Sequence, residues 1–307
     1  MLFLDSGAHS LYKKHTMLLG KRNDFRFYET DEFWNYVNDY AEFIKENKDR
    51  INIYVNVDVI FNPELTWKVQ RYLEDFHKLH PLPVFHSNED IKWFKKYLDK
   101  YDYIGVGGIG QTVGKTTWIR SVGDPVFSIV CDTPDRTPRV KLHGFAIASP
   151  ELIAKYPWAS VDTASWVIYG RYGGVIIPRK KNGKYDYTVP PWLIKTSWRN
   201  HHINIPGTHI DNVSDIQRKE FVRYFAEKGF VLGTSKYKKV SRDYELKENE
   251  QWIDRKKKDE VEIIIEKGVC NFHEIRDDLN LYYFLDMERN IPEYPWSWGI
   301  KTRRIFI

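Results

Sequence analysis

Cysteine is scarce in this sequence of 307 residues. The chain has two, Cys131 and Cys270, and they stand far apart. A disulfide framework needs several paired cysteines at short spacings, and a cysteine-rich zinc site needs several thiolate ligands close together. The sequence therefore excludes both, and we expect a reducing compartment.

Long apolar runs are absent as well. The first ten residues, MLFLDSGAHS, place an acidic residue after four apolar ones, and no uninterrupted apolar run approaches the roughly 20 residues that a membrane span requires. We expect a soluble, cytoplasmic protein with no membrane partner.

Several motifs of nucleotide and hydrolase chemistry are missing or incomplete. The stretch GVGGIGQTVGKTT, residues 105–117, looks like a phosphate loop, which needs a glycine five positions before its Gly-Lys-Thr. That position holds Ile109, with Gly108 and Gly110 on either side. No Gly-x-Ser-x-Gly elbow and no His-Glu-x-x-His motif occurs. The glycines of this stretch need another explanation than nucleotide binding.

Basic residues are in excess and occur in runs. Lys and Arg number 47 against 42 Asp and Glu, and the excess gathers at 179–181, 236–239, 255–258 and 301–304. Such runs are typical either of a surface that binds a polyanion or of a solvated, lysine-rich surface. Aromatic residues make up 16% of the chain, which can supply stacking faces for bases or a bulky core.

Short apolar runs alternate with amphipathic stretches in the first half of the chain. We expect strands at 2–5, 51–59, 82–86, 103–108 and 140–147, a further strand with its exit loop at 159–166, and helices at 31–47, 63–79, 88–100 and 150–157. This order predicts an α/β fold with a parallel sheet, closed into a (β/α)8 barrel or open and doubly wound. Further along, 171–191 is typical of a hairpin or insertion, and 213–229 and 236–258 of helices.

Polar residues and glycines stand where these strands end. In chain order they are Asp5-Ser6-Gly7, Asp58, His86, Gly107-Gly108, His143-Gly144 and Asp162-Thr163. Functional groups of βα folds collect at the carboxyl ends of strands, although any one Asp or Gly there is as typical of a helix cap or a turn. Carboxylates around one mouth indicate attack on a sugar or recognition of a base. A metal on Asp5, Asp58, His86 and Asp162 is an alternative.

These pieces resemble the tRNA-guanine transglycosylase (queuine/archaeosine tRNA-ribosyltransferase) superfamily, in particular its shorter phage-type relatives that place 7-deazaguanine bases in DNA. The similar segments, in the family's order over about residues 1–180, are LDSGAHS, YVNVDVIFNP, VFHSNED, YIGVGGIG and SVDTASW. Two positions depart from the family pattern, because His86 replaces the usual Gln and Ile109 the usual Leu.

The resemblance implies a (β/α)8 TIM-like barrel with insertions and a helical C-terminal extension. Its core with the active site would span residues 1–200, and the remaining barrel units and a basic helical region 201–307. The implied reaction exchanges guanine for a 7-deazaguanine base such as preQ0 through a covalent Asp–sugar intermediate. It needs no cofactor and no metal, and it would take place in the host cytoplasm if the chain is phage-encoded.

The resemblance also assigns roles to individual residues. Asp162 matches the nucleophile and Asp5 the proton shuttle. The expected base-binding residues are Ser6, Gly7, Asp58, His86, Gly107 and Gly108, with Trp166, Tyr12 or Phe61 as stacking candidates. Contacts to the nucleic-acid backbone are expected from Arg179, Lys180, Lys181, Arg255, Lys256 and Lys257.

The substrate follows from what the chain lacks. The tRNA enzymes carry a zinc site of cysteines and a histidine late in the barrel, and this chain has no such cluster, so we expect DNA as the substrate. The alternatives are the same exchange on tRNA, a metal-dependent TIM-barrel hydrolase or nuclease, and an inactive nucleic-acid-binding protein.

Overall fold

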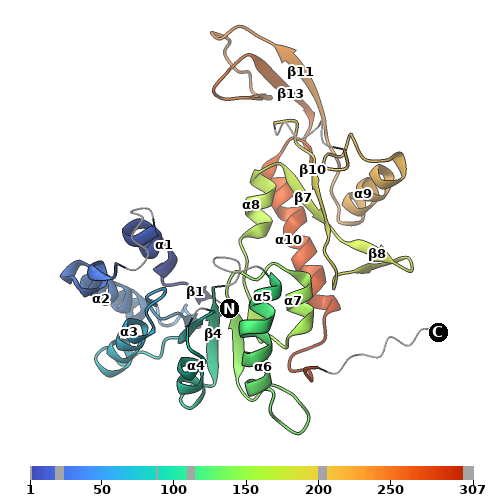
Figure 1. Cartoon of the computed structure of the whole chain (residues 1–307). Coiled ribbons are helices and arrows are strands. Elements are labelled where there is room, and N and C mark those ends of the chain that lie inside the picture. The colour runs from blue at the N-terminus through green and yellow to red at the C-terminus, as the bar shows by residue number, and fades with distance from the viewer. Residues whose placement is uncertain (1, 18–23, 88, 109–114, 200–205, 300–307) are drawn as a thin grey trace. The chain divides into compact units, whose positions relative to one another are not determined.

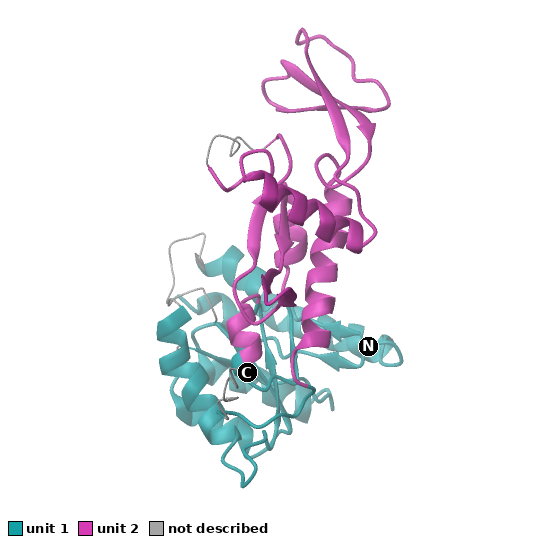
Figure 2. Ribbon diagram, turned by 90° about the vertical axis from the view of Figure 1, so that its right-hand side faces the viewer, with its two compact units in different colours: residues 1–147, 155–162, 293–307 teal, residues 148–154, 163–292 magenta. Residues whose placement is uncertain are grey.

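The computed structural model describes residues 2–17, 24–87, 89–108, 115–199 and 206–299. The chain divides into two compact units (Figure 2). Unit 1 comprises residues 1–147, 155–162 and 293–307, and unit 2 comprises residues 148–154 and 163–292. The sequence suggested a domain boundary near residue 200, and the two units are divided at other positions.

Unit 1 is built on parallel strands that follow one another in chain order. β1 (Phe3–Leu4) pairs with β2 (Ile53–Tyr54), and a parallel bridge between Val55 and Leu82 leads on to the next strand. From there the order is β3 (Val84–His86), β4 (Tyr103–Gly107), β5 (Lys141–Gly144) and β6 (Ser160–Val161). The α/β class with a parallel sheet is confirmed.

The helices of this region begin where the sequence supplies caps. Thr30, Asn62 and Asp90 each accept a backbone N–H of the first turn, and Pro63 opens its helix at a position where its missing N–H costs nothing. The longer helices are α2 (Asp31–Glu46), α3 (Pro63–Asp75) and α4 (Ile91–Leu98), and the shorter ones are α1 (Ala8–Tyr12), α5 (Lys115–Trp118) and α6 (Asp124–Val130). The next helix, α7 (Pro150–Lys155), falls almost wholly within unit 2.

The parallel strands are strongly curved. In a flat sheet β1 and β5 would lie about 19 Å apart, since neighbouring strands are about 4.8 Å apart. Instead the ring of Phe3 on β1 stacks on the imidazole of His143 on β5, with 4.5 Å between ring centroids. The sheet therefore curls until its first and fifth strands share side-chain contacts on the concave side.

Unit 2 combines helices with antiparallel strands (Figure 1). Helix α10 (His273–Asn290) packs on α8 (Ser165–Arg171), where Arg276 donates to the carbonyl of Gly170 at 2.8 Å. β7 (Gly174–Ile177) pairs with β10 (Trp192–Lys195), and β8 (Arg179–Lys181) with β9 (Lys184–Asp186). The hairpin expected within 171–191 is confirmed. The helix expected at 213–229 is α9 (Asp215–Glu227).

One expectation for the C-terminal part is wrong. Residues 236–258, predicted to be helical, contribute to a three-stranded antiparallel sheet of β11 (Thr234–Lys239), β12 (Glu250–Trp252) and β13 (Glu260–Glu266). The lysines of β11 fit a helix by propensity alone. The three consecutive isoleucines of β13 supply a β-branched partner strand, and this tertiary pairing overrides propensity.

None of the helices in the described ranges is long and apolar enough to cross a membrane.

Candidate active site

The expected site residues of unit 1 lie at one edge of the curved sheet. Asp5, Asp58 and Asp162 follow β1, β2 and β6, and His86 ends β3. Because the strands are parallel, their carboxyl ends share that edge. The charges of Asp58 and Asp162 both act on Asp5, so residues distant in sequence are electrostatic neighbours here.

The surroundings of Asp5 favour its protonated form. Its side chain is solvent-exposed, and its Oδ1 accepts the backbone N–H of Ser6 at 2.8 Å. Loss of hydration raises its pKa, and the negative charges of Asp58 and Asp162 raise it further. A carboxyl group with a raised pKa that remains accessible accepts a proton more readily than an ordinary carboxylate and can donate it again.

A second group of residues forms a buried ion cluster. Asp58 Oδ2 lies 3.0 Å from His86 Nε2, and Glu89 Oε1 lies 3.1 Å from His86 Nδ1. Burial alone lowers the pKa of His86, but its hydrogen bonds and charge interactions with the two carboxylates outweigh burial and raise it to about 10. His86 is therefore a cation held between two anions.

Glu89 is a site residue that the sequence did not reveal. Its carboxylate is fully buried, and it also accepts the backbone N–H of His86 at 3.2 Å. Its position three residues after His86, in the loop that leads into α4, is the one signal that could have indicated the pair.

The glycine pair at the end of β4 packs against this cluster. A Cβ on Gly107 would lie 3.1 Å from His86 Cδ2. The carbonyl of Gly107 accepts the N–H of Ser87, and the carbonyl of Gly108 accepts the Ser87 hydroxyl at 3.0 Å. These contacts account for the glycines without a base. Both ring nitrogens of His86 face carboxylates, so the predicted contact from His86 to a base oxygen has no donor left.

Asp162 lies in a different environment from Asp5. Its side chain is 59% exposed, and its Oδ1 accepts the N–H of Ala146 at 2.8 Å and lies 3.5 Å from His143 Nε2. Partial burial raises the pKa of Asp162, but the hydrogen bond and charge of His143 and the N–H of Ala146 outweigh this effect, so the net shift is downward. The surroundings of Asp162 thus favour its anionic form, whereas those of Asp5 favour the protonated form.

Ser6 and Gly7, predicted to bind the base, connect β1 to α1. Ser6 is 1% exposed, and within the described parts of the chain its hydroxyl has no hydrogen-bond partner. The Ser6 carbonyl accepts the Tyr36 hydroxyl at 2.6 Å, which anchors this turn to α2. Of the stacking candidates, Tyr12 is buried edge-on against Phe61, and Trp166 belongs to unit 2 on α8.

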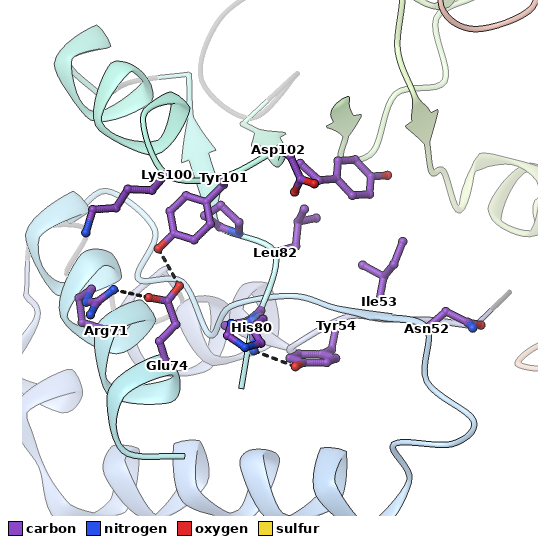
Figure 3. Close-up of a pocket in the computed structure, with 13 residues that line it drawn as sticks. Asn52, Ile53, Tyr54, Arg71, Glu74, His80, Leu82, Lys100, Tyr101 and Asp102 are labelled. Carbon is purple, nitrogen blue, oxygen red and sulfur yellow. Dashed lines mark hydrogen bonds and ion pairs between the residues drawn. The ribbon is translucent and has the colours of Figure 1, made fainter. Parts of the chain in front are cut away.

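A pocket of about 630 Å³ opens at the opposite edge of the sheet, where β2, β3 and β4 begin (Figure 3). Within it Glu74 accepts the Tyr101 hydroxyl at 2.7 Å and pairs with Arg71 at 2.5 Å. These polar groups satisfy one another, as expected at an edge that contributes stability. The polar residues of its wall include Asn52, Tyr54, His80, Lys100 and Asp102. The pocket is distinct from the carboxylate site.

The predicted backbone-binding residues all lie in unit 2. Arg179 donates to the carbonyl of Pro190 and lies over the ring of Trp192, and Lys180 pairs with Glu220 at 3.3 Å. Both are thus engaged within unit 2. Arg179 is exposed all the same, as are Lys181 and the three residues in the turn between β12 and β13, Arg255, Lys256 and Lys257.

The phosphate-loop pattern falls largely on residues 109–114, outside the described residues. Over the described ranges, no group of three or more His, Cys, Asp or Glu side chains is arranged to hold a metal ion. Comparison with family models, curated proteins and solved structures found no match.

Proposed function

We propose that this chain is a transglycosylase that exchanges guanine in DNA for a 7-deazaguanine base such as preQ0. One observation carries the proposal: two neighbouring carboxyl groups have environments that move their pKa values in opposite directions, upward for Asp5 and downward for Asp162. Such a divergence separates a proton carrier from an anionic nucleophile.

The reaction is two displacements at one carbon. Asp162 attacks C1′ of the target nucleotide; the C1′–N9 bond breaks, and protonated Asp5 gives its proton to the departing guanine. Asp5, now a carboxylate, accepts the N9 proton of the incoming base. N9 then attacks C1′, the ester bond to Asp162 breaks, and its carboxylate is regenerated. Two inversions give net retention at C1′.

In this proposal Asp58 recognises the base. One of its oxygens is occupied by His86, which leaves the other to accept the N1–H and the exocyclic amine of a guanine-like base. His86 then orients Asp58 rather than touching the base. Ser6, Gly7 and the glycine pair would shape the pocket around the ring.

The closed barrel and the choice of DNA as substrate belong to the same proposal. The strands of unit 1 would be the first part of a closed (β/α)8 barrel, a closure that the contact between β1 and β5 favours. DNA rather than tRNA is favoured by the shortage of cysteine for a zinc site. A base in duplex DNA must be flipped out before it can react, which costs a few kcal/mol that phosphate contacts would offset.

Exchange of radiolabelled guanine tests the proposal. The purified chain is incubated with labelled guanine and either duplex DNA or tRNA, with and without EDTA. We expect label in DNA, unaffected by EDTA, and none with Asp162→Asn. The matched control is Asp102→Asn, an exposed carboxyl group at the opposite edge, which should exchange normally. If label enters tRNA alone, tRNA is the substrate and DNA is not. If the chain instead cleaves nucleic acid and EDTA abolishes the cleavage, it is a metal-dependent hydrolase and the proposal is wrong.

A further inference from the structure

We propose that His143 is a positioning residue that, together with the backbone N–H of Ala146, fixes Oδ1 of Asp162 and so presents Oδ2 as the attacking oxygen. This inference rests on the proposed function for its chemistry. Its geometric basis, a cradle of one side chain and one backbone donor around a carboxylate, is independent of that function.

Both contacts of the cradle are made to the same oxygen. The N–H of Ala146 is 2.8 Å from Asp162 Oδ1, and His143 Nε2 is 3.5 Å from it. His143 Nε2 is buried, and within the described ranges it has no hydrogen-bond partner, so Asp162 Oδ1 is the acceptor it faces at a slightly long distance. A buried N–H without a partner is costly, and the Asp162 carboxylate is the acceptor that His143 faces. A small approach of the two atoms would form the hydrogen bond, which is what a positioning role requires.

A side-chain relay on the other side of the ring is compatible with a proton on Nε2 of His143. The Tyr103 hydroxyl on β4 is 2.5 Å from the Ser160 hydroxyl on β6, which is 2.6 Å from His143 Nδ1 on β5. With Tyr103 donating to Ser160 and Ser160 donating to Nδ1, the proton of a neutral imidazole is left on Nε2, facing Asp162. Three adjacent strands thus each contribute one member of the relay.

Aromatic packing fixes the plane of the imidazole. Phe3 stacks on it with 4.5 Å between centroids, and Phe145 meets it edge-on at 4.4 Å. Phe145 has room for this because Gly105 lies beneath it: a Cβ there would come within 2.4 Å of Phe145 Cε2. The first glycine of the GVGG stretch is therefore explained by packing around His143.

The backbone donor is also held at an energetic cost. Ala146 has φ of 57°, a left-handed conformation that is uncommon for a residue with a side chain. Strain of this kind persists where the surroundings impose it, often at functional sites. Here it directs an N–H at Asp162.

In the displacement, the C1′–N9 electron pair leaves with the base, Oδ2 forms the bond to C1′, and Oδ1 becomes the ester carbonyl. The two donors remain on Oδ1 throughout. When the incoming base attacks, they stabilise the carboxylate that is released. The cradle thus needs no movement during the reaction.

The test compares His143→Leu, which removes the donor, with His143→Gln, which keeps an N–H. The first readout is the titration of the Asp162 carboxyl carbon by NMR, assigned by its loss in Asp162→Asn. The titratable groups that act on Asp162 are His143 and Asp5, and Asp5 in turn interacts with Asp58, Tyr36 and Tyr40. We expect the titration to move to higher pH in His143→Leu and to return toward wild type in His143→Gln. Thermal unfolding confirms that each variant is folded.

The second readout is guanine exchange. We expect His143→Leu to lower its rate about 100-fold, the scale of a misplaced reacting group, and His143→Gln to restore part of it. An unchanged Asp162 titration in folded His143→Leu would overturn the inference. If the wild type shows no exchange, the proposed function fails, and the titration still decides whether the cradle exists. Should His143→Leu not fold, Ser160→Ala serves instead, and a titration of Asp162 equal to wild type would count against the relay.

Discussion

At the scale of single residues, the site is defined by how each carboxylate is surrounded. The charges of Asp58 and Asp162 act on Asp5, Asp58 faces a cationic imidazole, and Asp162 accepts the N–H of Ala146 and faces the imidazole of His143. Three identical side chains are thereby placed in three different environments. The sequence could predict Asp5, Asp58, His86 and Asp162 as candidates because each stands at or shortly after the end of a strand. It could not predict Glu89, His143 or Ala146 as their partners, because those contacts depend on loop paths and sheet curvature.

The charge on His86 should make the protein less stable at high pH. Burial opposes the charge, but Asp58 and Glu89 outweigh it and raise the pKa of His86 to about 10 from 6.5. Because the folded state binds this proton more tightly, the contribution is complete below pH 6.5 and is lost as the pH rises to about 10. The loss is at most about 1.4 kcal/mol per pH unit. Urea unfolding of wild type and His86→Gln across this range measures it. A stability difference between the two that does not shrink with rising pH would contradict the assignment.

Removal of one carboxylate from the cluster should be costly. Glu89→Gln leaves the buried imidazolium with one anionic partner, and we expect a loss of about 3 kcal/mol in the free energy of unfolding at neutral pH. The matched control is Glu46→Gln at the exposed end of α2, which should change stability by less than about 0.5 kcal/mol. Equal effects of the two substitutions would show that Glu89 is not part of an ion cluster.

At the scale of helices and strands, local signals predicted most of unit 1. Thr30, Asn62 and Asp90 cap helices that begin within a few residues of their expected starts, and the apolar runs became strands in the expected order. The error at 236–258 arose because lysine favours helices, whereas the strand that overrides this preference, β13, lies further along the chain. Short strands such as β6 depend on their neighbours for their ends, so their register could not be predicted.

The curl of the sheet should be sensitive to bulk on β4. Gly105 and Gly107 are two residues apart, but a Cβ would be 2.4 Å from Phe145 at the first and 3.1 Å from His86 at the second. We expect Gly105→Ala to cost about 1–3 kcal/mol, and Gly107→Ala less. Chemical unfolding of both variants measures the difference. A Gly107→Ala variant less stable than Gly105→Ala would contradict the packing described around His143.

At the scale of the whole molecule, the two units carry different kinds of chemistry. Unit 1 contains the three site carboxylates, Asp5, Asp58 and Asp162. Unit 2 presents basic side chains in an exposed turn between β12 and β13. Composition predicted basic surface runs, but it could not tell which basic side chains also interact with other residues of the same unit. Arg179, which packs on Trp192, is one that does.

The basic turn should set the salt dependence of nucleic-acid binding. Replacing Arg255, Lys256 and Lys257 together by Gln removes up to three phosphate contacts, and the slope of log affinity against log salt should fall by about 2 to 3. Fluorescence anisotropy with labelled duplex DNA measures it. Arg179→Gln is the control, with a smaller expected change because its guanidinium is already engaged. An unchanged slope in the triple variant would place the binding surface elsewhere.

The most direct measurement is a search for the covalent intermediate. Wild-type protein is incubated with guanine-containing DNA without added base, quenched in denaturant, digested and analysed by mass spectrometry. We predict a sugar–protein adduct on the peptide that contains Asp162, and none in Asp162→Asn. An adduct on another residue, or guanine exchange that persists in Asp162→Asn, would contradict the proposed role of this carboxylate.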